Sequence, residues 1–203
     1  MTESAQPADT APTGRPARAD DVDAVTDTLA RAFADDPLWG WAFASHEEVG
    51  TCWRRCLLSA IPEGWVWTTP GAEAVTLWIR PGRPELTPEH EALLVAELRA
   101  LMGDRADVPM TAFEALEAHH PRTEPHYYLS LLGTHPDHRG GGHGMRLLRT
   151  NLERIDSEHA AAYLESSNPA NLERYASVGF EPLEAFAIPG GGPTITTMWR
   201  PAR

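Results

Sequence analysis

The residues best suited to bind a ligand form a glycine-rich segment that follows an apolar stretch. The apolar stretch ends in Leu131-Leu132-Gly133, and Arg139-Gly140-Gly141-Gly142-His143-Gly144 follows after a short turn. A helix-forming sequence begins directly behind it, at Met145. A strand, a glycine loop and a helix in this order direct bare backbone N–H groups and a helix N-terminus toward one place. The segment therefore predicts a site for a phosphate or pyrophosphate group.

Two well-known phosphate loops do not fit this segment. A Walker A loop ends in Gly-Lys-Ser/Thr, and the chain contains no lysine. A Rossmann loop reads Gly-x-Gly-x-x-Gly, and its third glycine is replaced by Met145 or by Leu147 in the two available registers. The pattern that remains is Arg-x-x-Gly-x-Gly, from Arg139 to Gly144.

Composition limits the class of protein. The chain has 203 residues, of which 42% are hydrophobic and 23% charged, as expected for one globular domain over residues 14–203. Residues 1–13 are polar and rich in Pro, Ala and Thr, which predicts a disordered tail without the features of a secretory signal. The net charge of −12 argues against a nucleic-acid partner, and no apolar run is long enough to span a membrane. Cys52 and Cys56 are expected to be buried free thiols, which favours the cytoplasm.

Apolar periodicity and turn residues predict a mixture of helices and strands. Helices are expected over residues 22–33, 46–61, 86–102, 109–119 and 169–177, and one directly after the glycine loop. Strands are expected over residues 15–18, 65–69, 74–80, 126–133, 161–166, 180–188 and 194–199.

Several of these segments, taken together and in order, resemble the GNAT superfamily of acyl-CoA-dependent N-acyltransferases. The matching motifs are the strand His126-Tyr127-Tyr128-Leu129-Ser130-Leu131-Leu132-Gly133, the turn Pro136-Asp137-His138-Arg139-Gly140, the strand Leu164-Glu165-Ser166-Ser167, and the spacing Asn171-x-x-x-Tyr175-x-x-x-Gly179-Phe180. Within the superfamily the pattern is similar to antibiotic-modifying members of the puromycin N-acetyltransferase type. The resemblance implies an α/β (α+β) fold: a mixed central sheet of roughly six to seven strands, flanked by helices, with strands four and five splayed apart.

The resemblance also implies acetyl-CoA as cofactor and assigns residues to it. Arg139, Gly140, Gly141, Gly142, His143 and Gly144 would hold the pyrophosphate, because glycines let the main chain approach it closely. The backbone of Leu131, Leu132 and Gly133 would pair with the pantetheine arm, and a main-chain N–H near Leu131 would polarise the thioester carbonyl. Asn171 would bond a cofactor amide, whereas Asn168 is a weaker alternative that suits a helix cap.

For catalysis, the resemblance makes Tyr175 the acid that protonates the leaving thiolate, as a phenol of ordinary pKa. The sequence leaves several candidates for the general base. Glu165 is one candidate, because it faces away from Leu164 on its strand. His126, at the start of the preceding strand, is another, and Glu124, His120 or a water chain are further alternatives. His135, His138 and His143 lie on a turn and not on one helical face, so no metal is expected.

The expected acceptor is the primary amine of a small molecule, such as an amine antibiotic or a polyamine. Trp39 and Trp41 with Asp35 and Asp36 would suit a cationic, partly apolar amine, although they could equally pack a helix corner. Two alternatives remain: a GNAT-fold protein that binds acyl-CoA without turnover, and an enzyme that acetylates a protein. A homodimer is also left open.

Overall fold

The computed structural model of the protein describes residues 14–203, and the expected tail at residues 1–13 lies outside this part of the chain. A seven-stranded mixed sheet runs through it, in the spatial order β1-β2-β3-β4-β5-β7-β6. Only β4 and β5 pair in parallel among the described strands, and the other neighbours are antiparallel. The strands are β1 (Arg15–Pro16), β2 (Val66–Thr68), β3 (Ala74–Ile79), β4 (His126–Thr134), β5 (Ala161–Ser166), β6 (Glu181–Ala187) and β7 (Thr194–Arg200).

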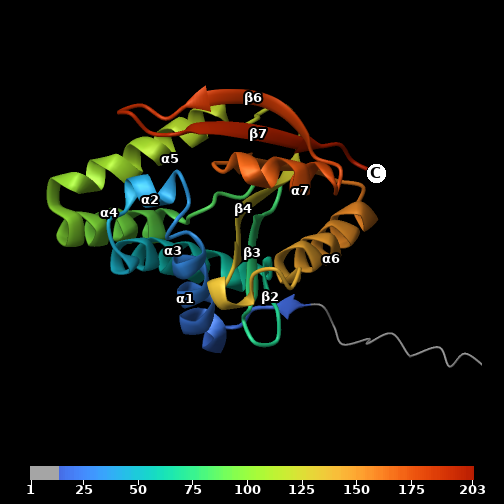
Figure 1. Ribbon diagram of the computed structural model, residues 1–203, viewed down its shortest axis with the longest axis horizontal. Helices are drawn as coiled ribbons and strands as arrows, with labels where there is room; N and C mark the ends of the chain where they lie inside the picture. Colours follow the sequence, from blue (N-terminus) through green and yellow to red (C-terminus); the bar gives the residue numbers. More distant parts are fainter. Residues whose placement is uncertain (1–13) are drawn as a thin grey trace, which may run out of the picture.

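Helices cover both faces of this sheet (Figure 1). One face is packed by most of the helices, and the opposite face is packed mainly by α6, which contacts β3 and β4. The helices are α1 (Val22–Ala32), α2 (Trp39–Ala42), α3 (His46–Ala60), α4 (Pro88–Met102), α5 (Asp107–His119), α6 (His143–Ser157) and α7 (Leu172–Ala176). Short 3-10 turns lie at Ala19–Asp21, Ile61–Glu63, Gly103–Ala106, Pro136–His138 and Pro169–Asn171.

The central strand β3 shows why the sheet has two covered faces. All six of its residues are buried, as expected for a strand between two layers. Leu77 and Ile79 pack toward α1 and α3, whereas Trp78 packs toward α6. Asn151 of α6 accepts hydrogen bonds from Thr76 Oγ1 at 2.7 Å and from Trp78 Nε1 at 3.1 Å. This buried polar contact fixes α6, and the loop at its N-terminus, against the sheet.

The feature that shapes the site is the splay between β4 and β5. Their parallel pairing ends at Leu129 and Leu164, although β4 continues to Thr134. Beyond that point β4 pairs only with β3, with a bulge at Ser130, and β5 pairs only with β7. The sheet therefore opens between the two strands, and the implied mixed sheet with a splay between strands four and five is confirmed.

The predicted elements are present, with shifts at their ends. The helix expected from residue 86 begins at Pro88, because the Thr87 side chain caps it by accepting from the N–H of His90 at 3.3 Å. The helix expected over 169–177 divides into a 3-10 turn and α7. Sequence patterning did not predict α2, which follows the Asp36-Pro37 turn. Cys52 and Cys56 are free and buried in α3.

Candidate functional site

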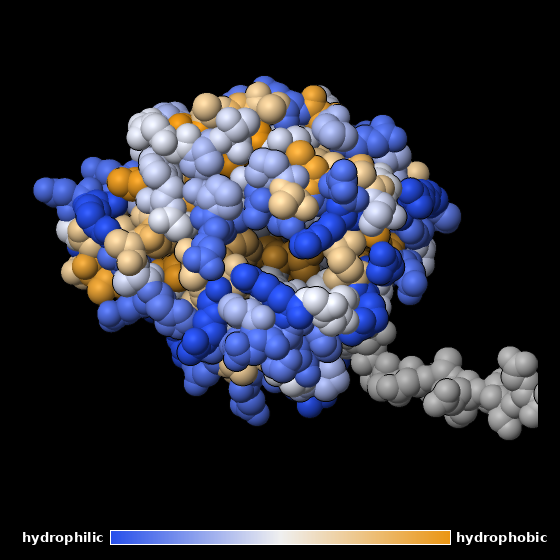
Figure 2. All heavy atoms as spheres, viewed as in Figure 1, coloured by the Kyte–Doolittle hydropathy of each residue, from blue (hydrophilic) through white to orange (hydrophobic). Residues whose placement is uncertain are grey.

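A cleft of about 580 Å³ lies where β4 parts from β5. Figure 2 shows the hollow at the centre of the face viewed, with hydrophobic atoms at its floor and hydrophilic ones around its rim. One wall comes from α1 and the loop before α6, and the other comes from α7 and the turn before it. The floor includes Leu132 and Gly133 of β4, where the strand has lost its neighbour on one side. An extended ligand therefore fits between the two walls.

The glycine loop places bare backbone at one end of this cleft. Gly140 and Gly142 have φ of 82° and 73°, a left-handed conformation that other residues adopt only with strain. Gly142 is the N-cap of α6, so the backbone N–H groups in the first turn of this helix have no partner within the helix. A Cβ on Gly144 would lie 2.6 Å from Thr134 Oγ1, so only glycine lets the helix start so close to β4. This cradle suits a phosphate or pyrophosphate.

Arginine side chains surround the loop. Arg139 Nη2 donates to the carbonyl of Ala32 at the C-terminal end of α1, at 2.9 Å. Arg146 Nη1 donates to the carbonyl of Gly141 at 2.6 Å. Arg139 thus connects the glycine loop to α1, and its positively charged side chain also lines the cleft. The positive charge of these side chains and the N-terminus of α6 favour an anionic ligand.

The opposite wall carries Asn171 and Tyr175. The Asn171 side chain accepts a hydrogen bond from Arg174 Nη1 at 3.0 Å. Both residues and Tyr175 line the cleft. Burial, followed by the nearby charge of Asp36, raises the pKa of Tyr175 to about 12, above the ordinary phenol pKa expected from the sequence. Tyr175 therefore holds its proton at neutral pH. Asn168 accepts from the N–H of Ala170 at 3.0 Å, which is the capping role considered for it.

Asp36 joins the two walls of the cleft. Its Oδ2 accepts a hydrogen bond from Ser167 Oγ at 2.7 Å. Its Oδ1 accepts from the N–H groups of Leu38 and Trp39, at 3.0 and 3.1 Å, and so starts α2. From the sequence Asp36 stood out only as a charge beside the aromatic segment. The Asp-Pro pair was the available signal for a cap, and nothing in the sequence indicated the contact with Ser167.

Glu165 lies at the point where the strands part. It is the first β5 residue beyond the last β4 pair, and it faces away from Leu164, which packs against α6. Its side chain is only 5% exposed. The Tyr128 and Tyr163 hydroxyls donate to its two carboxylate oxygens at 2.7 and 2.9 Å. Burial raises the pKa of Glu165 to about 7, although both tyrosine hydrogen bonds lower it.

His126 lies farther from this point and forms a pair with another histidine. Its Nε2 lies 3.1 Å from Nε2 of His120, and its Nδ1 lies 2.7 Å from the carbonyl oxygen of Glu124. Burial, followed by the charge of His126, lowers the pKa of His120 to about 4. His120 in turn lies 4.0 Å from a carboxylate oxygen of Glu165. Of the candidates for the base, the structure thus arranges Glu165, His120 and His126 in a row.

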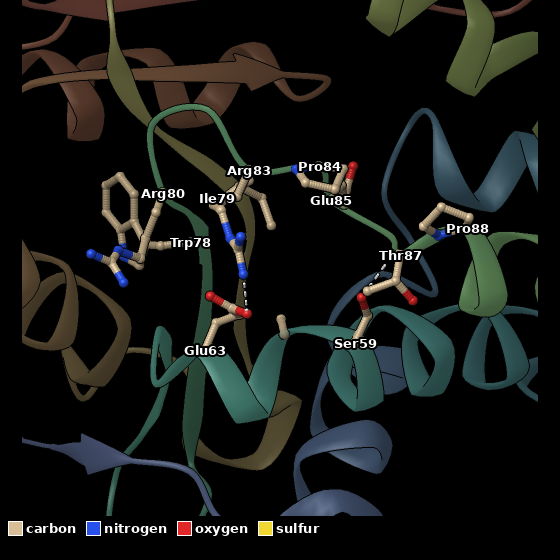
Figure 3. Close-up of a pocket in the computed structure, with 11 residues that line it drawn as sticks. Ser59, Glu63, Trp78, Ile79, Arg80, Arg83, Pro84, Glu85, Thr87 and Pro88 are labelled. Atoms are coloured by element: carbon tan, nitrogen blue, oxygen red, sulfur yellow. Dashed lines mark hydrogen bonds and ion pairs between the residues drawn. The ribbon is translucent and has the colours of Figure 1, made fainter.

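A smaller cavity of about 140 Å³ lies near the bulge of β4 (Figure 3). It is bordered by the end of α3, the end of β3 and the segment that leads to α4. Glu63 and Arg83 form an ion pair across it at 2.6 Å. Glu85, at its edge, accepts a hydrogen bond from the hydroxyl of Ser130, the bulge residue. Burial raises the pKa of the Glu85 carboxyl.

The structure brings most of the expected cofactor residues together in the cleft. Its lining includes Leu132, Gly133, Arg139, Gly140, Gly142, His143, Gly144, Asn171 and Tyr175. Leu131, Gly141, Glu165 and His126 are not part of that lining. Leu131 is 2% exposed and its side chain packs into the core on the α1 side. Glu165 and His126 lie at and beyond the inner end of the splay.

The aromatic residues expected near the acceptor mainly pack against one another. The Trp39 and Trp53 rings meet edge to face at 4.9 Å, and Trp39 lies 5.4 Å from Phe113. Trp39 and Trp53 are buried, so they stabilise the helical layer. Within residues 14–203, no His, Cys, Asp or Glu side chains form a group that could hold a metal ion, and none of the helices there is both long and apolar enough to cross a membrane.

Comparison with known proteins agrees with this geometry. Residues 62–180, more than half of the chain, match the model of the acetyltransferase (GNAT) family. The chain therefore belongs to the GNAT family of acetyltransferases, and it is an acyltransferase that uses acetyl-CoA.

Solved structures share the fold over nearly the whole chain. One is described as histone acetyltransferase HPA2 and related acetyltransferase from Corynebacterium glutamicum, with 24% identity, a TM-score of 0.67, and coverage of 96% of this chain and 98% of that one. The polyamine N-acetyltransferase of Drosophila melanogaster has 17% identity and a TM-score of 0.63, covering 93% and 98%. Arylalkylamine N-acetyltransferase 2 of Aedes aegypti has 12% identity and a TM-score of 0.66, covering 94% and 98%.

Proposed function

We propose that the protein transfers the acetyl group of acetyl-CoA to the primary amine of a small molecule. The observation that carries this proposal is the position of Glu165. It lies where β4 and β5 part, at the start of the splay that opens the cleft, although it is not among the residues that line the cleft. A buried carboxyl with a pKa of about 7 at that position can take a proton from an ammonium group.

The residues present fit acetyl-CoA. The N–H groups at the start of α6, with Arg139 and Arg146, would hold the pyrophosphate. The unpaired edge of β4 at Leu131, Leu132 and Gly133 offers backbone partners for an extended amide chain. When bound, acetyl-CoA supplies an acetyl group activated as a thioester.

Glu165 would act as the general base. Its carboxylate accepts a proton from the ammonium of the acceptor, which leaves a nucleophilic amine. The Tyr128 and Tyr163 hydroxyls hold the carboxylate in place by donating to both of its oxygens. Since its pKa is near 7, about half of the carboxyl is ionised at neutral pH. We prefer Glu165 to His126, because His126 lies farther from the cleft.

Tyr175 would act as the general acid. It lines the cleft, and its raised pKa of about 12 keeps its hydroxyl protonated at all physiological pH values. It donates this proton to the departing sulfur as the amine nitrogen bonds to the acetyl carbon and the carbon–sulfur bond breaks. A thiolate is a weaker base than the phenolate left behind, so the geometry and the charge of nearby Arg174 must assist the transfer.

The acceptor would be a cationic small amine. Glu85 and Glu117 lie near enough to Glu165 to raise its pKa further, so this end of the site is acidic. As their names state, the polyamine and arylalkylamine acetyltransferases with the same fold act on amines. An amine antibiotic, the acceptor type of puromycin N-acetyltransferase, belongs to the same chemical class. The two free, buried cysteines agree with a reaction in the cytoplasm.

The test is thiol release from acetyl-CoA with a panel of polyamines, arylalkylamines and amine antibiotics, with CoA binding measured in parallel. We expect turnover on at least one small amine. Tight CoA binding without turnover on any small amine would favour a protein acceptor, which a peptide panel would then reveal, or a non-catalytic binding protein. Absence of CoA binding would contradict the assignment of the glycine loop.

A further inference from the structure

The carboxyl of Glu165 is enclosed, so a proton that it accepts needs a route to solvent. Its side chain is 5% exposed, and both of its oxygens receive tyrosine hydroxyls. Burial raises the pKa of Tyr128 and of Tyr163, so neither phenol loses its own proton. These tyrosines hold the carboxyl in place and do not carry the proton away.

Two histidines connect Glu165 to an exposed loop. His120 Nδ1 lies 4.0 Å from Glu165 Oε1, and His120 Nε2 lies 3.1 Å from His126 Nε2. His126 Nδ1 lies 2.7 Å from the carbonyl oxygen of Glu124, which belongs to the exposed loop between α5 and β4. The two imidazole rings thus lie in a row between the carboxyl and the carbonyl of Glu124, with the His120 side chain 21% exposed and His126 8% exposed.

The hydrogen bonds fix which nitrogen of each ring carries a proton. A carbonyl oxygen only accepts, so the proton of His126 must be on Nδ1. Its Nε2 is then an acceptor, and His120 must donate to it from Nε2–H. Nδ1 of neutral His120 therefore presents a lone pair toward Glu165. Every ring is oriented to accept a proton on its inner side and to release one on its outer side.

From this arrangement we infer that His120 and His126 form a proton relay from Glu165 to solvent. The inference rests on the proposed acetyl transfer with Glu165 as the base. Protonated Glu165 gives its proton to Nδ1 of His120, which passes the proton on its Nε2 to Nε2 of His126. His126 releases its Nδ1 proton to water at the carbonyl of Glu124. Both rings end neutral, and each returns to its first tautomer by exchanging a proton with water.

The surroundings of the two rings favour proton transfer in which neither imidazole becomes a long-lived imidazolium cation. Burial lowers the pKa of His120, and Glu117 and Arg122 act on the ring in opposite directions. Tyr128 and Tyr163 pack edge-on against His120, with ring centres 4.9 and 5.0 Å away, and Trp199 packs against His126. The gap of 4.0 Å between Glu165 and His120 exceeds a hydrogen bond, so the first proton transfer requires the two side chains to approach by about 1 Å.

The first test uses His120→Gln and His126→Gln, with His119→Gln as the matched control. His119 is the neighbour of His120 in sequence, but its ring stacks on Phe186 and faces Glu184, outside the row. We expect both relay variants to lower kcat at least about tenfold, with an unchanged KM for acetyl-CoA. Added imidazole should restore part of kcat in these variants and not affect the control, a response that a merely structural role would not produce.

The second test is independent of folding in the variants. Nitrogen-15 NMR of the wild-type protein should show Nδ1–H for His126 and Nε2–H for His120. Opposite tautomers would overturn the relay, and so would variants that keep the wild-type kcat or whose lost activity imidazole does not restore. A wild-type protein that acetylates no amine at all would instead overturn the proposed function, and the relay with it.

Discussion

Tyr175 and Tyr127 illustrate how position decides what a tyrosine can do. Both have a pKa raised to about 12, chiefly by burial. The Tyr127 hydroxyl donates a hydrogen bond to the Glu158 carboxylate at 2.6 Å, on the α6 side of the sheet. Tyr175 lines the cleft, and its hydroxyl proton is available to a ligand there.

We predict that Tyr175→Phe lowers kcat by on the order of 10²-fold or more, with little change in KM for acetyl-CoA, because only proton donation is removed. Tyr127→Phe is the matched control, since it deletes a tyrosine hydroxyl with a similarly raised pKa outside the cleft. Its kcat should equal that of the wild type in steady-state thiol release. Similar losses in both variants would argue for a structural effect.

The raised pKa of Glu165 makes the stability of the fold depend on pH. In the unfolded chain a glutamate titrates near its ordinary value of about 4.3, whereas in the fold its pKa is about 7. The folded state therefore holds the proton more tightly. Its stability is greatest when the carboxyl is protonated in both states and falls as pH rises from about 4 to 7.

Two results should follow for Glu165→Gln. Acetyl transfer should be lost at every pH, whereas the wild-type kcat should rise with pH through about 7. The variant should also unfold less readily than the wild type at pH 8, by up to a few kcal/mol, and by much less at pH 5. Urea titrations at the two pH values measure this. Equal stabilities at pH 8 would show that the carboxyl is not held at a raised pKa.

At the scale of elements, the loop before α6 depends on a left-handed N-cap. Gly142 has φ of 73° and ψ of 10°, nearly the same as Gly64, with 74° and 16°, at the end of the 3-10 turn after α3. An alanine at either position carries the same backbone strain, about 1 kcal/mol. Only Gly142 lies at the cleft.

We therefore predict that Gly142→Ala and Gly64→Ala lower the unfolding free energy by similar amounts. Gly142→Ala alone should raise KM for acetyl-CoA, roughly tenfold, because a Cβ enters the phosphate cradle and approaches Arg146. Chemical denaturation and steady-state kinetics on the pair separate the two effects. An unchanged KM in Gly142→Ala would contradict the assigned phosphate loop.

The C-terminal strand is fastened to α6 by one buried arginine. The Arg200 side chain is 3% exposed, and its two terminal nitrogens donate to the Asp156 carboxylate at 2.6 and 2.7 Å. Its Nε donates to the carbonyl of Val178 at 2.9 Å. This contact joins β7 to the end of α6 and to the segment after α7.

Removing this contact should be costly. We expect Arg200→Met to lower the unfolding free energy by about 3 kcal/mol, since it leaves Asp156 and a carbonyl without their partner. The control is Arg99→Met, because the Arg99–Asp107 pair at 3.0 Å is exposed and worth less than about 1 kcal/mol. Equal losses in urea denaturation would show that burial does not strengthen the first pair.

At the scale of the whole molecule, the net charge of −12 favours the approach of cations. The edge strand β6 disfavours sheet pairing between two copies, because Pro182 lacks an N–H, the register shifts beside it, and Glu181 and Glu184 would face like charges.

We predict that kcat/KM for a dicationic amine falls more than that for a monocationic amine when the salt concentration rises from 20 to about 300 mM, because the Debye length shrinks below about 10 Å. Steady-state kinetics at fixed acetyl-CoA measure this. The same salt dependence for both amines would indicate that the long-range charge does not steer the acceptor.

The sequence by itself determined the order of most helices and strands, the position of the glycine loop and the family. These depend on local spacing: apolar periodicity forms the elements, and Arg139 to Gly144 encode their own turn and helix start. The sequence also indicated that Glu165 opposes Leu164, because side chains alternate along a strand.

Only the tertiary structure decided what these side chains meet. The pKa of Glu165 depends on burial and on Tyr128, which the parallel pairing of β4 and β5 brings close. The contact of Asp36 with Ser167 and the row from Glu165 through His120 to His126 join residues from different elements. Such contacts follow from how strands pair and helices pack, and no spacing along the chain records them.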